Sequence, residues 1–143
     1  MTLTDKVLKY CAFQDRSKLE VRRKMRELKM PDSEADDLMV LLEEQNYVND
    51  ERFAESFIRG KINIKRWGRI KIRIELQQRG IDSGIIYSKM EEIDNEQYLN
   101  NLQYLMERWK RENPDGERAK MFRFLMSKGY TADEISQCGK SSD

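Results

Sequence analysis

The chain has 143 residues, a net charge of +1, no histidine and two cysteines, Cys11 and Cys138. The missing histidine excludes Ser-His-Asp and Cys-His catalysis and any zinc site that uses an imidazole ligand. The two cysteines stand alone near opposite ends, so we expect reduced thiols, no metal and a cytoplasmic location. We expect neither a signal peptide nor a membrane span, because residues 1–14 carry charges and no apolar run is long enough.

Composition favours helices over strands. Apolar residues make up 38% of the chain and charged residues 37%, with only 7 glycines and 2 prolines. Such a composition supports a thin core and a wide surface, as in an extended array of helices.

Helix start and stop signals recur along the chain. Ser17 and Thr131 are each followed three residues later by a glutamate, which is the capping-box pattern, and Asn49, Asp94 and Asp115 are further candidate N-caps. Gly80 and Gly129 follow amphipathic runs, as glycines after a helix C-terminus do. Apolar spacing between these signals predicts helices at about 4–14, 17–29, 33–46, 50–65, 68–79, 83–93, 95–111, 116–128 and 132–138.

Residues 70–76 alternate strictly between apolar and polar side chains, a pattern typical of a strand. An internal repeat argues for a helix instead. A shift of 51 residues places residues 17–30 on 68–81, and a shift of 49 then places residues 72–86 on 121–135. Because the flanking repeats read as capped helices, we predict a helix over 69–79.

The predicted fold is all-α. We expect three tandem degenerate three-helix repeats that form an elongated, curved helical array, at residues 1–48, 49–94 and 95–143, of which the second is the basic one. The alternative is a single irregular helical bundle.

Charge is banded along the chain. Residues 1–30 carry nine basic and four acidic side chains, 31–57 one and nine, 59–79 eight and one, and 80–104 one and five. A basic segment with an aromatic ring suits a polyanion, whereas the plainer interpretation is a solvated helix face with the ring in the core. The candidate binding residues are Arg59, Lys61, Lys65, Arg66, Trp67, Arg69, Lys71, Arg73 and Arg79.

Two of these arginines are seven residues apart. If the helix reached back to Arg66, then Arg66 and Arg73 would share one side, with Lys65 and Arg69 close by. No catalytic residue is predicted, because neither a phosphate-binding loop nor a base and nucleophile pair is present.

Three blocks resemble the RecX family of bacterial regulatory proteins: residues 47–54 (YVNDERFA), 67–81 (WGRIKIRIELQQRGI) and 124–131 (FLMSKGYT). The resemblance implies an array of three-helix repeats that binds RecA, enters the groove of its filament on DNA, and suppresses strand exchange, ATP hydrolysis and coprotease activity. It also implies a role in homologous recombination, DNA repair and the SOS response.

The same resemblance implies no catalytic site and no cofactor. The expected partners are the RecA filament and single- or double-stranded DNA, with no membrane, and the expected state is a monomer. Two alternatives stay open: a helical protein that binds nucleic acid by itself, and a generic helical-repeat scaffold.

Overall fold

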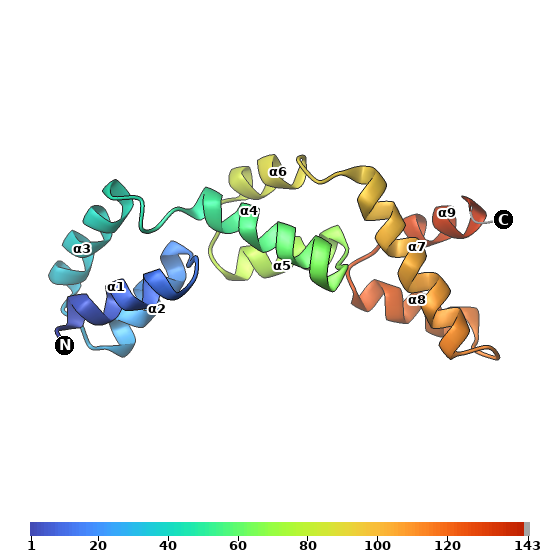
Figure 1. Cartoon of the computed structure of the whole chain (residues 1–143), viewed down its shortest axis with the longest axis horizontal. Helices are drawn as coiled ribbons and strands as arrows, with labels where there is room; N and C mark the ends of the chain where they lie inside the picture. Colours follow the sequence, from blue (N-terminus) through green and yellow to red (C-terminus); the bar gives the residue numbers. More distant parts are fainter. Residues whose placement is uncertain (142–143) are drawn as a thin grey trace.

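The protein, described from a computed structural model that covers residues 1–141, is an elongated row of helices (Figure 1). Within these residues there are nine α-helices, a five-residue π-helical turn (η1) and no strand, so the all-α prediction is confirmed. The elements are α1 (Leu3–Phe13), α2 (Lys18–Glu27), α3 (Asp32–Glu44), α4 (Asp50–Gly60), η1 (Lys61–Lys65), α5 (Arg69–Gln78), α6 (Ser83–Met90), α7 (Asn95–Glu112), α8 (Arg118–Ser127) and α9 (Ala132–Ser141).

The helices form three groups along the row: α1 to α3, α4 to α6, and α7 to α9 (Figure 1). We call them repeats one, two and three. The repeat limits at residues 48 and 94 stay a prediction.

One turn recurs in every repeat. After α2, α5 and α8 the chain adopts a left-handed conformation, at Lys29 (φ +60°), Gly80 (φ +74°) and Gly129 (φ +105°). The next amide then donates to a carbonyl five residues back, with N to O distances between 3.0 and 3.3 Å. These positions are 51 and 49 residues apart, which is the spacing that aligned the repeats in the sequence.

The alternating segment is helix α5, as the internal repeat predicted. Ile72 and Leu76 are fully buried, whereas Ile74 is 44% exposed. The buried pair lies four residues apart on one face of the helix, and packing of that face outweighs the local preference for a strand.

The helix predicted at about 50–65 differs in its second half. Helix α4 ends at Gly60 and continues as η1, and Arg66 then takes a left-handed conformation with φ +54°. The π-helical turn closes with the Trp67 amide donating to the Lys61 carbonyl at 3.0 Å. Asp115 is not an N-cap as predicted, because α8 begins at Arg118, three residues later, and Glu117 occupies the N-cap position.

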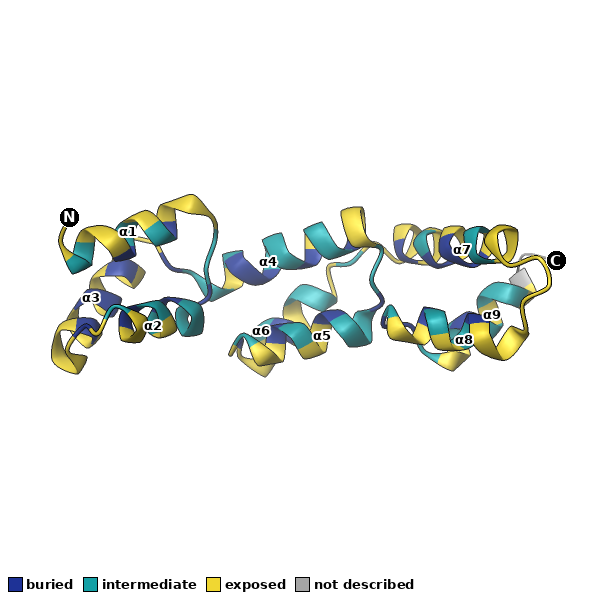
Figure 2. Ribbon diagram, turned by 90° about the horizontal axis from the view of Figure 1, so that it is seen from below, coloured by how far each residue is buried: buried dark blue, intermediate teal, exposed yellow. Residues whose placement is uncertain are grey.

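Buried side chains form two separate clusters, which appear as dark blue inner faces in Figure 2. Repeat one has a cluster of its own, from Val7 to Val48. Repeats two and three share the other cluster, from Phe53 to Ile135. The second and third repeats are therefore joined through a common core.

The joint between repeats two and three is made by the N-terminus of α5. An α-helix leaves its first amides without intrahelical acceptors, and here repeat three supplies acceptors. The Gly68 amide donates to the Lys128 carbonyl (2.7 Å), Ile70 to the Gly129 carbonyl (3.1 Å), and Arg69 to the Tyr98 hydroxyl (3.0 Å).

Two buried tyrosines complete this joint. The Tyr130 hydroxyl donates to the Arg66 carbonyl at 2.8 Å, and the rings of Tyr98 and Tyr130 lie 5.3 Å apart. Burial raises the pKa of both phenols above its ordinary value, so both hydroxyls stay protonated at neutral pH.

The joint between repeats one and two combines polar contacts with the Leu19 side chain, which lies against Gly80. Asp50 accepts from the Lys18 amide at 2.9 Å, at the start of α2. Asp15 accepts from Arg52 (3.1 Å) and from the Ser56 hydroxyl (3.0 Å). No core cluster spans this joint within residues 1–141, so hydrogen bonds, ion pairs and the Leu19–Gly80 contact connect repeat one to the rest.

Leu76→Ala and Leu125→Ala are each expected to lower the free energy of unfolding by about 2–5 kcal/mol, because both side chains are fully buried at equivalent repeat positions. Chemical denaturation followed by circular dichroism measures the change. A loss below about 1 kcal/mol at either site would contradict an equivalent core role.

Gly68→Ala tests the joint between repeats two and three. A Cβ at Gly68 would overlap the backbone of Gly129, whereas a Cβ at Gly60 meets nothing within 4 Å. We expect Gly68→Ala to destabilise the protein by about 1–3 kcal/mol or more. The control Gly60→Ala should be neutral or stabilising by up to about 1 kcal/mol, because alanine favours helix. Equal unfolding midpoints for the two variants would show that the joint accommodates a Cβ at Gly68 without a loss of stability.

Candidate functional site

The basic segment 59–79 is folded into a hairpin made by the end of α4, η1 and α5. The chain reverses at Arg66, so α5 runs back alongside α4 in the central repeat (Figure 1). The reversal brings together cations that a single straight helix would distribute around its circumference.

Lys61, Lys71 and Arg79 gather around two aromatic rings, and we call these five residues the Trp67 cluster. The ammonium groups of Lys61 and Lys71 lie 4.5 and 4.3 Å from the centre of the Trp67 ring. Phe57 meets Trp67 edge-on, with centroids 6.4 Å apart, and the Arg79 guanidinium lies 4.8 Å from the Phe57 centroid. Each contact is a cation–π or aromatic contact of ordinary length.

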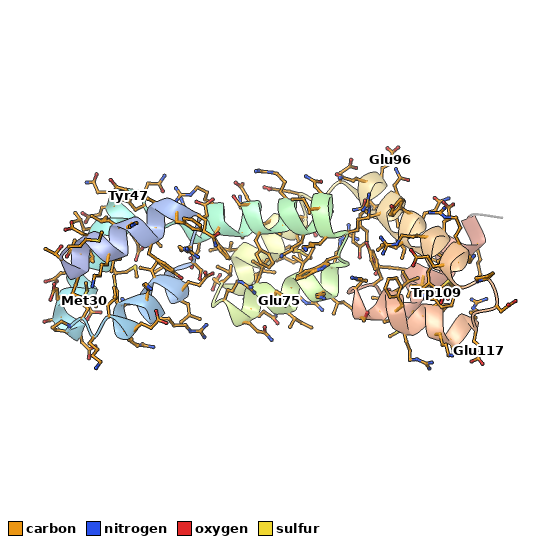
Figure 3. The ribbon with its side chains drawn as sticks, turned by 60° about the horizontal axis from the view of Figure 1, so that its bottom comes forward. Met30, Tyr47, Glu75, Glu96, Trp109 and Glu117 are labelled. Atoms are coloured by element: carbon orange, nitrogen blue, oxygen red, sulfur yellow. The ribbon has the colours of Figure 1, made fainter. Side chains whose placement is uncertain are left out.

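Positive charge dominates this cluster. Partial burial lowers the pKa of Lys61 below its ordinary value, and the nearby charges of Lys65 and Arg79 lower it further. Glu75 acts in the opposite direction, but it already accepts a 2.7 Å hydrogen bond from Arg79. Figure 3 labels Glu75 among the side chains of the central repeat. An anion placed at the cluster would relieve the repulsion among the lysines.

Trp67 itself is half-buried and packs against the shared core of repeats two and three. Lys61, Lys71 and Phe57 already occupy its surroundings. The structure therefore agrees with the plainer interpretation, in which the ring is a core residue that organises cations.

Two predicted site residues take part in the joint with repeat three. The Arg66 guanidinium lies 4.0 Å from the centre of the Tyr104 ring. Arg69 lies 3.8 Å from the Tyr98 ring centre and pairs with Glu134 at 3.7 Å. Both side chains are therefore engaged within the protein.

The predicted grouping of Arg66 with Arg73 on one helix side is wrong, because α5 begins at Arg69 and Arg66 lies in the left-handed turn before it. The three remaining cations, Arg59, Lys65 and Arg73, are exposed, and none forms an ion pair within the described part of the chain. These three are available to a partner.

Sequence reasoning missed Phe57 and Tyr104 as neighbours of the cations. Phe57 falls within the helix predicted at about 50–65, and Tyr104 lies 38 positions beyond Arg66. Helical spacing identifies side chains on one face, but it carries no information about which other helix will face them.

The two thiols and the acidic side chains of the described residues form neither an activated nucleophile nor a metal-ligand group. Burial raises the pKa of the Cys11 and Cys138 thiols, so neither is held as a reactive thiolate. Across residues 1–141 no group of His, Cys, Asp or Glu side chains converges as metal ligands. Over the same residues no helix is long and apolar enough to cross a membrane.

The fold and the cation surface define a tandem array of three-helix units with a basic central repeat. The family model for the second three-helix domain of RecX matches residues 49–88. The family model for the third three-helix domain matches residues 96–138. The matches cover more than half of the chain, and the chain belongs to the RecX family, as the resemblance predicted.

Regulatory protein RecX of Bacillus cereus (strain AH820) is 27% identical over 135 residues, which cover 92% of this chain and 50% of that protein. The same protein of Bacillus mycoides (strain KBAB4) is 26% identical over the same length. The chain thus spans about half the length of the curated relatives it matches.

Solved structures share the fold. The crystal structure of RecX from Lactobacillus salivarius superposes with a TM-score of 0.86 at 22% identity, over 97% of this chain and 93% of the other. A second crystal structure of regulatory protein RecX gives 0.85 at 22% identity, over 96% of this chain and 70% of the other.

The direction in which the pKa of Lys61 shifts can be tested in two variants. We expect a titration of 13C-methylated lysines by NMR to give Lys61 a pKa below the ordinary lysine value. Glu75→Gln removes the charge that raises this pKa and should lower it further, whereas Lys71→Gln removes a repelling charge and should raise it. Shifts of the same sign in both variants would show that direct charge interactions do not set the pKa.

Proposed function

We propose that this chain regulates the RecA recombinase by binding in the groove of the RecA filament on DNA. Binding would suppress strand exchange, ATP hydrolysis and coprotease activity, in the cytoplasm and without catalysis by the chain itself. Membership of the RecX family, whose matched relatives are named regulatory proteins, carries this proposal.

The elongated row of repeats and its basic centre support the proposal physically. A filament groove lined by phosphates and carboxylates attracts a cationic surface, and a row of repeats can follow a groove over several subunits. We assign direct contact to Arg59, Lys65 and Arg73, which are exposed and unpaired, and assign the local positive field to Lys61, Lys71 and Arg79. Arg66 and Arg69 would hold the basic repeat against repeat three.

The triple variant Arg59→Glu, Lys65→Glu and Arg73→Glu tests this assignment. Because all three side chains are exposed, helix content and unfolding midpoint should change little. The concentration that half-suppresses RecA-driven strand exchange should rise by about tenfold or more, since opposed charges replace three attractive ones. Wild-type binding should also weaken steeply with added salt.

A matched control carries the same change of net charge elsewhere. Arg26→Glu, Arg111→Glu and Lys120→Glu reverse three exposed cations of repeats one and three. This control should suppress strand exchange within about threefold of the wild type, because screening limits the reach of distant surface charges. Equal loss in the two triple variants would mean that total charge, and not the central repeat, governs binding.

A second candidate function is autonomous binding of nucleic acid, which the positive charge of the Trp67 cluster favours through attraction to phosphates. The two functions differ in which target the chain binds more tightly. Regulation of the filament requires tighter binding to RecA on single-stranded DNA than to either component alone. Equal affinity for bare DNA and for the filament would support the second function.

A further inference from the structure

A second group of aromatic and basic side chains lies in repeat one, away from the central basic segment. It is formed by the end of α1, the loop after it and one residue of α2. Phe13 is 80% exposed and belongs to neither core cluster. Tyr10, one turn earlier, is half-buried against the core of repeat one.

Arg16 connects the two rings. Its guanidinium lies 3.8 Å from the centre of the Tyr10 ring and 5.8 Å from that of Phe13. Its Nε also donates to the Tyr10 carbonyl at 3.2 Å, so the side chain is held in place at two points. The planar cation therefore needs little further ordering before it binds a ligand.

A hollow of about 380 Å³ lies over this group. It is lined by cations and by aromatic and aliphatic side chains, and none of the lining residues is acidic. Lys6 and Lys9 of α1 are exposed and unpaired among residues 1–141, and the Lys24 ammonium lies 5.4 Å from the Tyr10 ring centre. We call Lys6, Lys9, Tyr10, Phe13, Arg16 and Lys24 the Phe13 platform.

The nearby acids are engaged elsewhere. Asp15 accepts hydrogen bonds from Arg52 and Ser56 at the joint with repeat two. Asp5 caps the start of α1 through the Thr2 amide. Glu27 pairs with Lys24 at 3.3 Å, which leaves Lys6, Lys9 and Arg16 as the uncompensated charges of the platform.

We propose that the Phe13 platform binds single-stranded nucleic acid, with a base stacked on Phe13 and the backbone phosphates at Lys6, Lys9 and Arg16. The ring exposes apolar surface that a base can cover, and guanidinium and aromatic planes both stack on bases. A duplex hides its base faces, so only an unpaired strand can use the ring. Trp67 cannot serve in the same way, because its own lysines and Phe57 surround it.

Other anionic partners fit less well. Acidic side chains would match the lysines and Arg16, but a carboxylate has no apolar face to cover the Phe13 ring. An anionic membrane needs a broad apolar face, whereas here one exposed ring stands among four cations. This proposal does not depend on RecA or on the central basic segment.

The test is fluorescence anisotropy of the full chain, without RecA, with a labelled dT oligonucleotide. Phe13→Ala and the pair Lys6→Glu and Lys9→Glu should each weaken binding by about fivefold or more, and Phe13→Trp should preserve it. Tyr87→Ala is the matched control, because Tyr87 is 71% exposed on a different repeat. It should leave the affinity unchanged, and circular dichroism checks that each variant is folded.

A photoreactive benzophenone residue at position 13 gives a second readout. It should cross-link to the dT strand in the wild-type background and in the triple variant at Arg59, Lys65 and Arg73, even where suppression of RecA is lost. The two proposals can therefore fail separately.

Four results would overturn the platform: no binding of dT, affinity unchanged by Phe13→Ala, equal affinity for a duplex of the same length, or equal competition by poly-glutamate. Binding to phosphatidylglycerol vesicles that depends on Phe13, without binding to dT, would also overturn it in favour of a membrane contact.

Discussion

The docking of the α5 N-terminus onto the turn after α8 is the contact on which the rest of the structure depends. Three amides that α5 cannot satisfy internally find acceptors in repeat three, and two glycines let the backbones meet without a Cβ between them. Because the contact uses backbone groups and buried phenols, it fixes the angle between repeats two and three, and the two repeats then close one shared core. The repeat-one joint uses exposed and half-buried side chains instead, and its core stays separate.

This docking also determines which cations are free. Arg66 and Arg69 flank the docked turn, so their side chains stack on Tyr104 and Tyr98 of α7. Lys61 and Lys71 stay beside Trp67, where partial burial lowers the pKa of Lys61 and the charges of Lys65 and Arg79 lower it further. A segment with eight basic residues therefore presents three that are exposed and unpaired, and the remaining ones shape the field or the joint. Counting charges along a sequence overstates the number that a partner meets directly.

The basic surfaces of repeats one and two differ in how their aromatic rings are packed. In the Trp67 cluster of repeat two the aromatic rings are packed and the cations surround them, whereas in repeat one an exposed ring stands beside a guanidinium fixed on a second ring. The first arrangement suits electrostatic attraction to a polyanionic groove. The second suits the stacking of single bases on the exposed ring. The joint between repeats one and two lacks a shared core within residues 1–141, whereas repeats two and three share one.

The sequence by itself determined the helices, most of their caps and the register of the repeats. These depend on short-range physics: Ser17 and Thr131 cap the helices that follow them, Gly80 and Gly129 adopt positive φ, and Leu76 and Leu125 fall at one buried position. It also located the basic segment, because charge is visible residue by residue. Only the tertiary structure decided that η1 interrupts the fourth helix, that Arg66 leaves the helix of Arg73, and that Phe57 and Tyr104 receive the cations. Those outcomes require knowing which helices meet. Part of that information lies in contacts between residues 29 and 64 positions apart, and helical periodicity does not encode it.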